Sequence, residues 1–223
     1  MTAIILQSRL DSSRLKGKAL LLLDGEPLVF RVMEALNNVP ADLRILACPE
    51  DSFQAFKPIA QKAGFEITAG PKEDVLERYC QAIKRFSITR VIRATGDNPF
   101  VFTDAAFAIS AEGTALNADY SGYSGLPYGA GVEAVSACAL LLAGEKAASS
   151  YEREHVCPYL YNNPQSFNLH RPLAPLRWQG SGIRLTVDTQ EDFNRAEILY
   201  TALKNENLRH HGFTIINTYK KLF

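Results

Sequence analysis

Residues 3–18 read Ala-Ile-Ile-Leu-Gln-Ser-Arg-Leu-Asp-Ser-Ser-Arg-Leu-Lys-Gly-Lys, an apolar run that passes directly into a polar, basic stretch. The run from Ala3 to Gln7 predicts a short strand. The next periodic segment, Pro27 to Leu36, predicts a helix, because Pro27 suits the first helical position and Leu28, Val32 and Leu36 then share one face. The basic stretch between them is therefore expected to be a loop that leaves the first strand.

The same alternation of short strands and longer helices continues along the chain. We predict strands at residues 44–47, 65–68 and 90–94, and helices at residues 52–63, 74–86 and 103–110. Strands that alternate with helices are typical of βαβ units, which build a parallel sheet with helices on both faces. The sequence therefore predicts an α/β fold, Rossmann-like in its three α/β/α layers, with a mostly parallel sheet.

The second half of the chain is less regular. The glycine-rich segment 113–131 predicts turns and short strands, followed by a strand at 132–135 and a helix at 137–146. A helix at 152–161, a last strand at 184–187 and a helix marked by residues 193–203 complete the pattern. No internal repeat or linker interrupts it, so residues 1–223 are expected to form one domain, in which segment 113–131 lines a pocket or joins subunits.

Composition excludes several classes of protein. Hydrophobic residues make up 47% and charged residues 22% of the chain, which excludes a disordered regulator. Twenty-four basic residues balance twenty-four acidic ones, so no global positive field attracts a nucleic acid or an anionic membrane. The first apolar run is broken at Arg9 and lacks the core of a signal peptide, and the four cysteines form no Cys-x-x-Cys pair. We expect a cytoplasmic protein with reduced cysteines.

The loop from Gln7 to Lys18 is the strongest candidate for a binding site. It holds four cations and three hydroxyls in twelve residues, and ligands of open α/β sheets bind beyond the carboxyl ends of the strands. Backbone amides and hydroxyls suit phosphates, and Arg9, Arg14 and Lys18 would neutralise them. The alternative is a solvated surface loop. Neither Gly-x-Gly-x-x-Gly nor a Walker A sequence is present.

Two aspartates follow predicted strands and face the same crevice. Asp97 lies in Arg-Ala-Thr-Gly-Asp-Asn-Pro, residues 93–99, and Asp188 ends the stretch Leu-Thr-Val-Asp, residues 185–188. Mg²⁺ favours one or two carboxylates together with phosphate oxygens and water, so the pair beside a basic loop predicts a magnesium–phosphate site. Each aspartate taken alone also fits a turn or a helix cap.

These segments, in this order, resemble the cytidylyltransferases that activate acidic sugars, including the KDO and acylneuraminate enzymes, and most closely the spore coat polysaccharide branch. The opening pattern of that branch, Gln-Ala-Arg-x-x-Ser-Thr-Arg-Leu-Pro-Gly-Lys, corresponds here to residues 7–18, with Asp11 and Lys16 as the main departures. The resemblance covers nearly the whole chain. Further matches are residues 74–79, 93–99, 131–133, 153–159 and 185–189.

The resemblance implies a fold of the nucleotide-diphospho-sugar transferase type and a Mg²⁺-dependent reaction in which CTP and a sugar acid give a CMP-sugar and pyrophosphate. Arg9, Lys18, Asp97 and Asp188 would be catalytic, and the two aspartates would bind the metal. The residues that would bind the nucleotide are Gln7, Arg9, Ser12, Ser13, Arg14, Lys18, Arg78, Thr95 and Asp97.

The sugar side of the site is marked by fewer residues. Glu133, Arg153 and His155 are candidates for the sugar pocket or for proton transfer, and each also fits a structural role. The resemblance further implies a homodimer. Two alternatives remain open for the function: a nucleotidyltransferase for another nucleotide or a sugar phosphate, and a weakly active partner subunit that binds a nucleotide or sugar.

Overall fold

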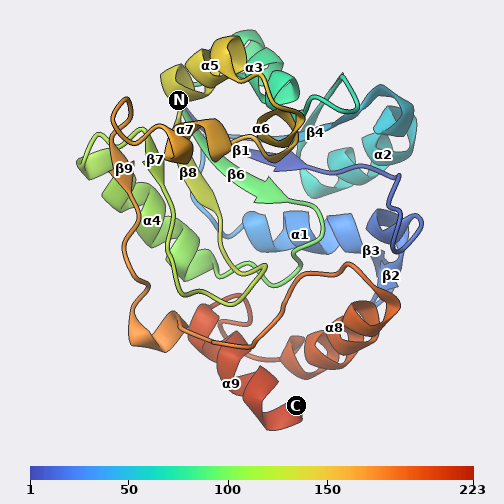
Figure 1. The fold of residues 1–223 in the computed structure, drawn as a ribbon. Coiled ribbons are helices and arrows are strands. Elements are labelled where there is room, and N and C mark those ends of the chain that lie inside the picture. The colour runs from blue at the N-terminus through green and yellow to red at the C-terminus, as the bar shows by residue number, and fades with distance from the viewer.

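A seven-stranded sheet forms the centre of the computed structural model, which describes residues 1–223 (Figure 1). The strands lie in the order β5 (Glu66–Gly70), β4 (Leu43–Pro49), β1 (Thr2–Gln7), β6 (Arg90–Thr95), β8 (Glu133–Ser136), β7 (Tyr120–Ser121) and β9 (Leu169–His170). β5, β4, β1 and β6 are mutually parallel, β8 runs antiparallel to β6 and β7, and β9 is parallel to β7. The predicted α/β fold with a mostly parallel sheet is confirmed.

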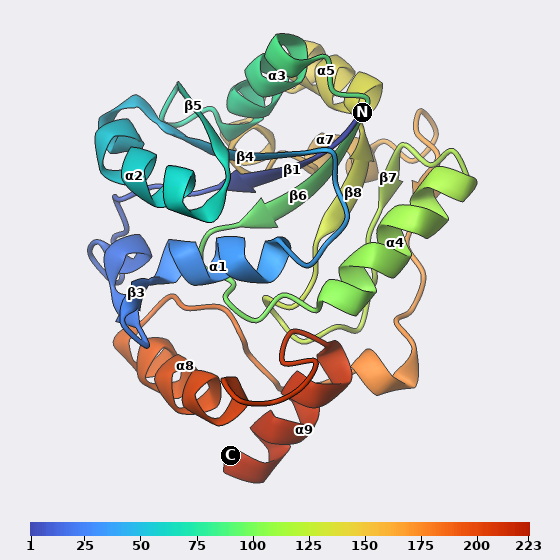
Figure 2. The same cartoon turned by 180° about the vertical axis from the view of Figure 1, so that it is seen from behind.

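Helices cover both faces of this sheet (Figures 1 and 2). One face carries α3 (Val75–Phe86), α5 (Ala137–Lys146), α6 (Ser150–His155) and α7 (Pro158–Asn162), and the other carries α1 (Leu28–Leu36), α2 (Phe53–Ala63) and α4 (Thr103–Ala115). Along β1, Ala3 and Ile5 pack in the first layer, whereas Ile4 and Leu6 pack in the second. Both faces of β1 are buried, which explains its uninterrupted apolar run.

A third cluster of apolar side chains lies on the outer side of α1. It joins α8 (Gln190–Leu203), α9 (Gly212–Leu222) and the short helix η3 (Leu176–Trp178) to Leu185 and Val187. These helices lie at the bottom of Figure 1, and α9 was not predicted. The remaining elements are η1 (Lys18–Leu20), β2 (Leu22–Leu23), β3 (Glu26–Pro27) and η2 (Glu50–Ser52). No helix here combines the length and the apolar character that spanning a bilayer demands.

The helix predicted at 103–110 continues to Ala115 and takes in the first residues of segment 113–131. Two further sequence predictions need correction. The expected strand at 184–187 is an extended segment outside the sheet, because its N–H groups bond to loops: Leu185 N donates to Tyr128 O at 2.8 Å, and Val187 N donates to Asp97 O at 2.8 Å. The expected helix at 152–161 is two helices, α6 and α7, separated by a turn at Val156. Both corrections fall in segments that reach the site.

Candidate active site

A cleft of about 460 Å³ lies beyond the carboxyl ends of β1 and β6. Of its 22 lining residues, only three are hydrophobic. They come from the loop after β1, from α3, from the loop after β6, from Tyr128 and Gly129, from the end of α6 and from the extended segment before α8. Most of the residues that the sequence predicted for the site line this cleft: Gln7, Arg9, Ser12, Ser13, Arg14, Lys18, Arg78, Thr95, Asp97, His155 and Asp188.

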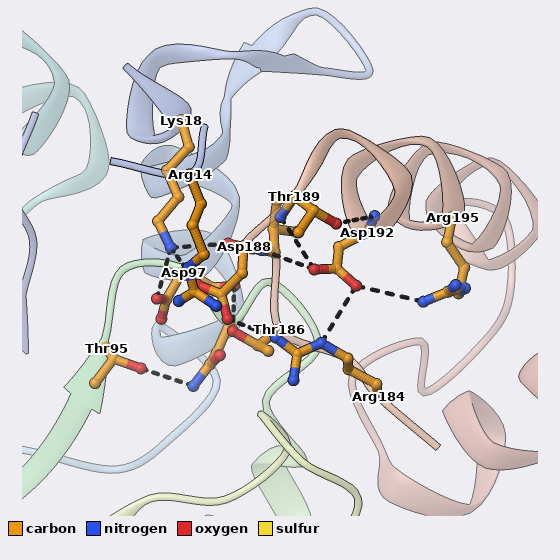
Figure 3. Close-up of polar contacts among 12 residues, drawn as sticks. Arg14, Lys18, Thr95, Asp97, Arg184, Thr186, Asp188, Thr189, Asp192 and Arg195 are labelled. Carbon is orange, nitrogen blue, oxygen red and sulfur yellow. Dashed lines mark hydrogen bonds and ion pairs between the residues drawn. The ribbon is translucent and has the colours of Figure 1, made fainter. Parts of the chain in front are cut away.

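Lys18 is the centre of a cluster of charged groups (Figure 3). Its ammonium Nζ donates to Asp97 Oδ2, to Asp188 Oδ1 and to the carbonyl oxygen of Val187, each at 2.9 Å. Asp188 also forms ion pairs with Arg14 through Oδ1 at 2.8 Å and with Arg184 through Oδ2 at 2.5 Å. The carboxylates of Asp97 and Asp188 therefore converge on one cationic group.

The start of α8 fixes the position of Asp188. Asp192 accepts hydrogen bonds from the backbone N–H groups of Asp188 and Thr189, both at 3.1 Å, and forms a capping box with Thr189. Arg184 Nε donates to Asp192 Oδ1 at 3.2 Å. Burial acts to raise the pKa of Asp192, but the N–H of Asp188, the contacts with Thr189 and the charge of Arg184 together lower it below its usual value. Asp192 thus stays ionised and fixes the backbone of Asp188 and the side chain of Arg184.

The basic loop is anchored at its middle. Leu10 N donates to Ser52 Oγ at 3.3 Å, and Asp11 forms an ion pair with Lys72 at 2.8 Å. Lys72 also contacts Asp51 at 3.3 Å, and its hydrogen bond and charge lower the pKa of Asp11. Asp11, the acidic group that departs from the family pattern, therefore lines the cleft with its charge paired to Lys72.

Gln7 and Arg93 form part of the cleft floor. Arg93 lies opposite Glu133 in the register of β6 and β8, and its guanidinium pairs with Glu133 Oε2. Arg93 Nε donates to Gln7 Oε1 at 3.2 Å, and Tyr120 OH donates to Glu133 Oε1 at 2.8 Å. Because a guanidinium can only donate, Gln7 must present its amide nitrogen elsewhere. Glu133 is not among the lining residues, since both of its oxygens are engaged below the floor.

Arg78 reaches the cleft from α3 without a carboxylate partner. Its Nη1 donates to the carbonyl oxygens of Pro71 and Lys72, at 2.6 and 3.0 Å, and its buried Nε has no partner. Burial lowers the pKa of this guanidinium, which nevertheless remains charged because an arginine is protonated at all ordinary pH values. A buried cation bonded only to carbonyl groups is suited to an electron-rich ligand group.

The end of α6 presents Glu154 and His155 to the cleft through a strained turn. Val156 has φ 72° and ψ −57°, and Cys157 N donates to His155 O at 2.8 Å, which together define a γ-turn. Left-handed backbone is costly for a β-branched residue and is typical of functional sites. The His155 ring packs on Tyr151 with centroids 4.5 Å apart.

The two residues before His155 differ in direction: Glu154 faces the cleft and Arg153 does not. Glu154 Oε1 lies 3.8 Å from Arg9 Nη2, across the cleft. Arg153 points away from the cleft: it pairs with Asp74 at 3.1 Å and donates to the carbonyl oxygens of Ala147 and Gly144 at 3.0 and 2.9 Å. Arg153 is not a lining residue and ties α6 to α3 and α5.

Sequence reasoning missed several lining residues. Asn98 Nδ2 donates to Thr95 Oγ1 at 2.7 Å, while its buried Oδ1 has no partner. Asn98, Arg93 and Glu154 all lay in the quoted motifs, so their place in the sequence was the available signal. Tyr128 and Gly129 enter the cleft from the glycine-rich segment.

No group of three or more His, Cys, Asp or Glu side chains is arranged to hold a metal. The acidic donors of the cleft floor are the pair Asp97 and Asp188, with the carbonyl oxygen of Val187 beside them. These are hard oxygen donors, of the kind and number that Mg²⁺ takes when phosphates and water complete its coordination. The residues present therefore fit a hard divalent cation shared with a phosphorylated ligand.

The doubly wound sheet with a polar cleft at the carboxyl ends of β1 and β6 defines an α/β protein of the class that binds its ligand at that edge of the sheet. More specifically, the chain belongs to the cytidylyltransferase family, whose sequence model matches residues 3–217. The spore coat polysaccharide biosynthesis protein SpsF of Bacillus subtilis is 30% identical over 203 residues, covering 88% of this chain and 85% of that protein. A 3-deoxy-manno-octulosonate cytidylyltransferase of Alteromonas mediterranea is 29% identical over 102 residues, or 44% of this chain and 40% of that enzyme.

Solved structures share the fold. A cytidylyltransferase from Leptospira borgpetersenii superposes with a TM-score of 0.89 and 23% identity, covering 99% of this chain and 94% of that one. A CMP:2-keto-3-deoxy-manno-octonic acid synthetase complexed with CTP superposes with a TM-score of 0.71 and 16% identity, covering 90% of this chain and 98% of that one. At these identities, the similarity shows a common fold.

Proposed function

We propose that this cytidylyltransferase transfers CMP from CTP to an acidic sugar, with Mg²⁺, and so makes a CMP-sugar for a polysaccharide or surface glycan. The observation that carries the proposal is the convergence of Asp97, Asp188 and Lys18 beside a basic loop at the carboxyl edge of the sheet. Family membership supports the nucleotidyl transfer, and the relatives that act on 3-deoxy-manno-octulosonate support an acidic acceptor.

The basic loop is assigned to the triphosphate. Arg9 and Arg14 line the polar cleft with side chains that are about half exposed, and each guanidinium is paired with a carboxylate there, Glu154 and Asp188 respectively. Triphosphate oxygens would replace these carboxylates as partners of the two guanidinium groups. Ser12 and Ser13 add hydroxyl donors from the same loop. Held in place by the Asp11–Lys72 and Leu10–Ser52 contacts, this loop would stabilise the charge that develops on departing pyrophosphate.

Asp97 and Asp188 are assigned to the metal, and the direction of their oxygens supports this assignment. Both carboxylates accept from the single Nζ of Lys18 at 2.9 Å, so their oxygens point to one cationic position. A bound Mg²⁺ supplies Lewis-acid polarisation of phosphate oxygens and lowers the pKa of a nearby hydroxyl. The chain contributes the anchoring, because Arg184 and Asp192 hold Asp188 from behind.

The remaining residues divide between the base and the sugar. Arg78, Gln7 and Thr95 would contact the nucleotide, with Arg78 offering a buried positive charge to an electron-rich edge of the base. His155, which lines the cleft, is assigned to the sugar. Glu133 and Arg153, which sequence analysis placed at the sugar, act from outside the cleft, through Arg93 and Asp74 respectively.

The proposed reaction needs positioning rather than a covalent intermediate. A sugar hydroxyl oxygen attacks the α-phosphorus and forms the new P–O bond, while the bond from the α-phosphorus to the bridging oxygen of the β-phosphate breaks. Pyrophosphate leaves in line with the attacking oxygen and keeps the electron pair of the broken bond, and the proton of the hydroxyl passes to water. The cations of the basic loop balance the charge on the leaving group.

The test has two stages on the purified chain. Thermal melting with each of the four ribonucleoside triphosphates shows which one stabilises the fold, because a ligand that binds only the native state raises the melting temperature. Pyrophosphate release is then measured with CTP, Mg²⁺ and a panel of nine-carbon and eight-carbon sugar acids, with a neutral sugar phosphate as the matched control acceptor. Release with CTP and an acid supports the proposal. Release only with the neutral acceptor, or only with another nucleotide, refutes it.

A cytoplasmic, single-domain homodimer remains part of the proposal. All four cysteines are free, and Cys48, Cys80 and Cys157 are buried, which suits a reducing compartment. Exposed apolar side chains at Leu173 and Leu176, which are 67% and 84% exposed, suit a contact between subunits. Light scattering coupled to gel filtration should give about twice the chain mass, and a monomer at all concentrations would refute the dimer.

A further inference from the structure

Lys18 occupies the position on which the carboxylates of Asp97 and Asp188 converge. An ammonium has three N–H groups, and here all three are used: one on Asp97, one on Asp188 and one on the carbonyl oxygen of Val187, each at 2.9 Å. Only 15% of the lysine side chain is exposed. Lys18 therefore sits in a complete three-oxygen cage, which is the environment of a bound cation.

The surrounding charges leave little attraction for a further cation. Asp188 Oδ1 is shared between Lys18 and Arg14, and its Oδ2 is paired with Arg184. Three cationic side chains therefore surround this one carboxylate, whose side chain is 8% exposed. A divalent ion that enters this cage has to displace an ammonium tethered to the same chain. Because the Lys18 ammonium belongs to the same chain, it competes at a high effective concentration that does not depend on the protein concentration.

A nucleoside triphosphate changes this balance. Its phosphate oxygens offer new acceptors to Lys18 and Arg14, whose flexible side chains can then leave the carboxylates. The carboxylates are left with excess negative charge just as phosphate oxygens arrive to complete a metal site.

We propose that Lys18 is a built-in cation of the carboxylate pair, so that a divalent metal binds tightly only together with the nucleotide. The proposal rests on the proposed function for the identity of the nucleotide. It adds a binding order: the free protein keeps its acidic pair neutralised by lysine, and metal enters with the triphosphate.

Direct metal binding tests the proposal without turnover. Mn²⁺, whose free ion gives an electron paramagnetic resonance signal, is titrated into wild-type protein, the Lys18→Met variant and the Lys16→Met variant, all without nucleotide. Lys16 is the matched control, because it lies in the same loop, is exposed and forms no ion pair. A second titration uses wild-type protein with saturating CTP, corrected by a blank of CTP and Mn²⁺ alone.

Removal of the competing charge should tighten Mn²⁺ binding by Lys18→Met at least about tenfold over wild type, with Lys16→Met unchanged. Wild-type protein should gain a similar factor when CTP is added, and this arm requires no variant to fold. The proposal is overturned if Lys18→Met binds Mn²⁺ no better than Lys16→Met, or if wild-type protein binds Mn²⁺ equally well with and without CTP. These titrations contain no sugar, so an inactive sugar panel leaves their outcome readable and bears on the proposed function alone.

Discussion

The ion pair beneath the cleft floor provides a quantitative test of what Glu133 does. Its carboxylate pairs with Arg93 and accepts from Tyr120 OH at 2.8 Å, and the side chains of Arg93 and Glu133 are only 14% and 21% exposed. A Glu133→Gln substitution keeps the shape but removes the charge, leaving a buried guanidinium without its counter-ion. Loss of one partner of a buried pair costs about 3–5 kcal/mol, and the partial exposure here favours the lower end, about 3 kcal/mol.

For a chain of this length, such a loss lowers the melting temperature by about 6–12 °C. The assay is urea and thermal unfolding followed by circular dichroism. Glu154→Gln is the matched control, because its pair with Arg9 spans 3.8 Å and both side chains are about half exposed. That variant should lose less than about 1 kcal/mol.

Removing both charges at once separates the loss of the pair from the cost of one unpaired buried charge. Replacing Arg93 by Met and Glu133 by Leu together removes both charges, so the double variant should recover most of the stability lost by Glu133→Gln. The reasoning is refuted if Glu133→Gln melts within about 2 °C of wild type and instead raises the KM for the sugar. That result would mean that Glu133 contacts substrate directly.

Three further predictions follow from single contacts. Asp97→Asn removes one carboxylate from the cage around Lys18 and should lower the rate of pyrophosphate release at least about 100-fold with the fold intact by circular dichroism; near-normal turnover would remove Asp97 from the metal site. Burial, and then the charge of Arg209, lowers the pKa of His210 from 6.5 to about 4, so unfolding takes up a proton below pH 6.5 and the protein becomes less stable as the pH is lowered. His210→Gln should therefore reduce the drop in melting temperature between pH 6.5 and pH 5, and an unchanged slope would contradict this. Gly129→Ala would place its Cβ 2.6 Å from the backbone N of Thr186 at φ +90°, whereas the Cβ of Gly182→Ala would meet nothing within 4 Å at a similar φ of +79°. Gly129→Ala should therefore be less stable than Gly182→Ala by at least about 1 kcal/mol in urea unfolding, and equal losses would argue against a close approach at Gly129.

The sequence predicts a site residue well where that residue comes just after a strand of the sheet. Asp97 lies two residues after the end of β6, so its place at the carboxyl edge of the sheet could be predicted from that strand alone. Asp188 was predicted for the same edge from a strand that does not exist. It still arrives there, because Val187 N bonds to Asp97 O and holds the extended segment against the loop after β6.

Other features depend on contacts that no local pattern encodes. α4 continues through Gly113, which was interpreted as the start of a turn; the glycine is there because a Cβ would lie 2.3 Å from Ser121 Oγ. The break between α6 and α7 places the β-branched Val156 in left-handed backbone, which such residues disfavour. In the sequence, only Pro158, which starts α7, indicates a new helix there. Glu133 was a candidate sugar ligand because the sequence cannot show which partner lies across the next strand.

The most direct test of the central claim follows the phosphorus atoms of CTP by ³¹P nuclear magnetic resonance, with Mg²⁺ and the sugar acid that passes the release assay. The account predicts that the three CTP signals are replaced by pyrophosphate and by one new phosphodiester signal of equal molar amount, and that Asp97→Asn leaves CTP intact. Formation of orthophosphate or free CMP without a phosphodiester would show hydrolysis instead of transfer, and would contradict the assignment of this cleft to CMP-sugar synthesis.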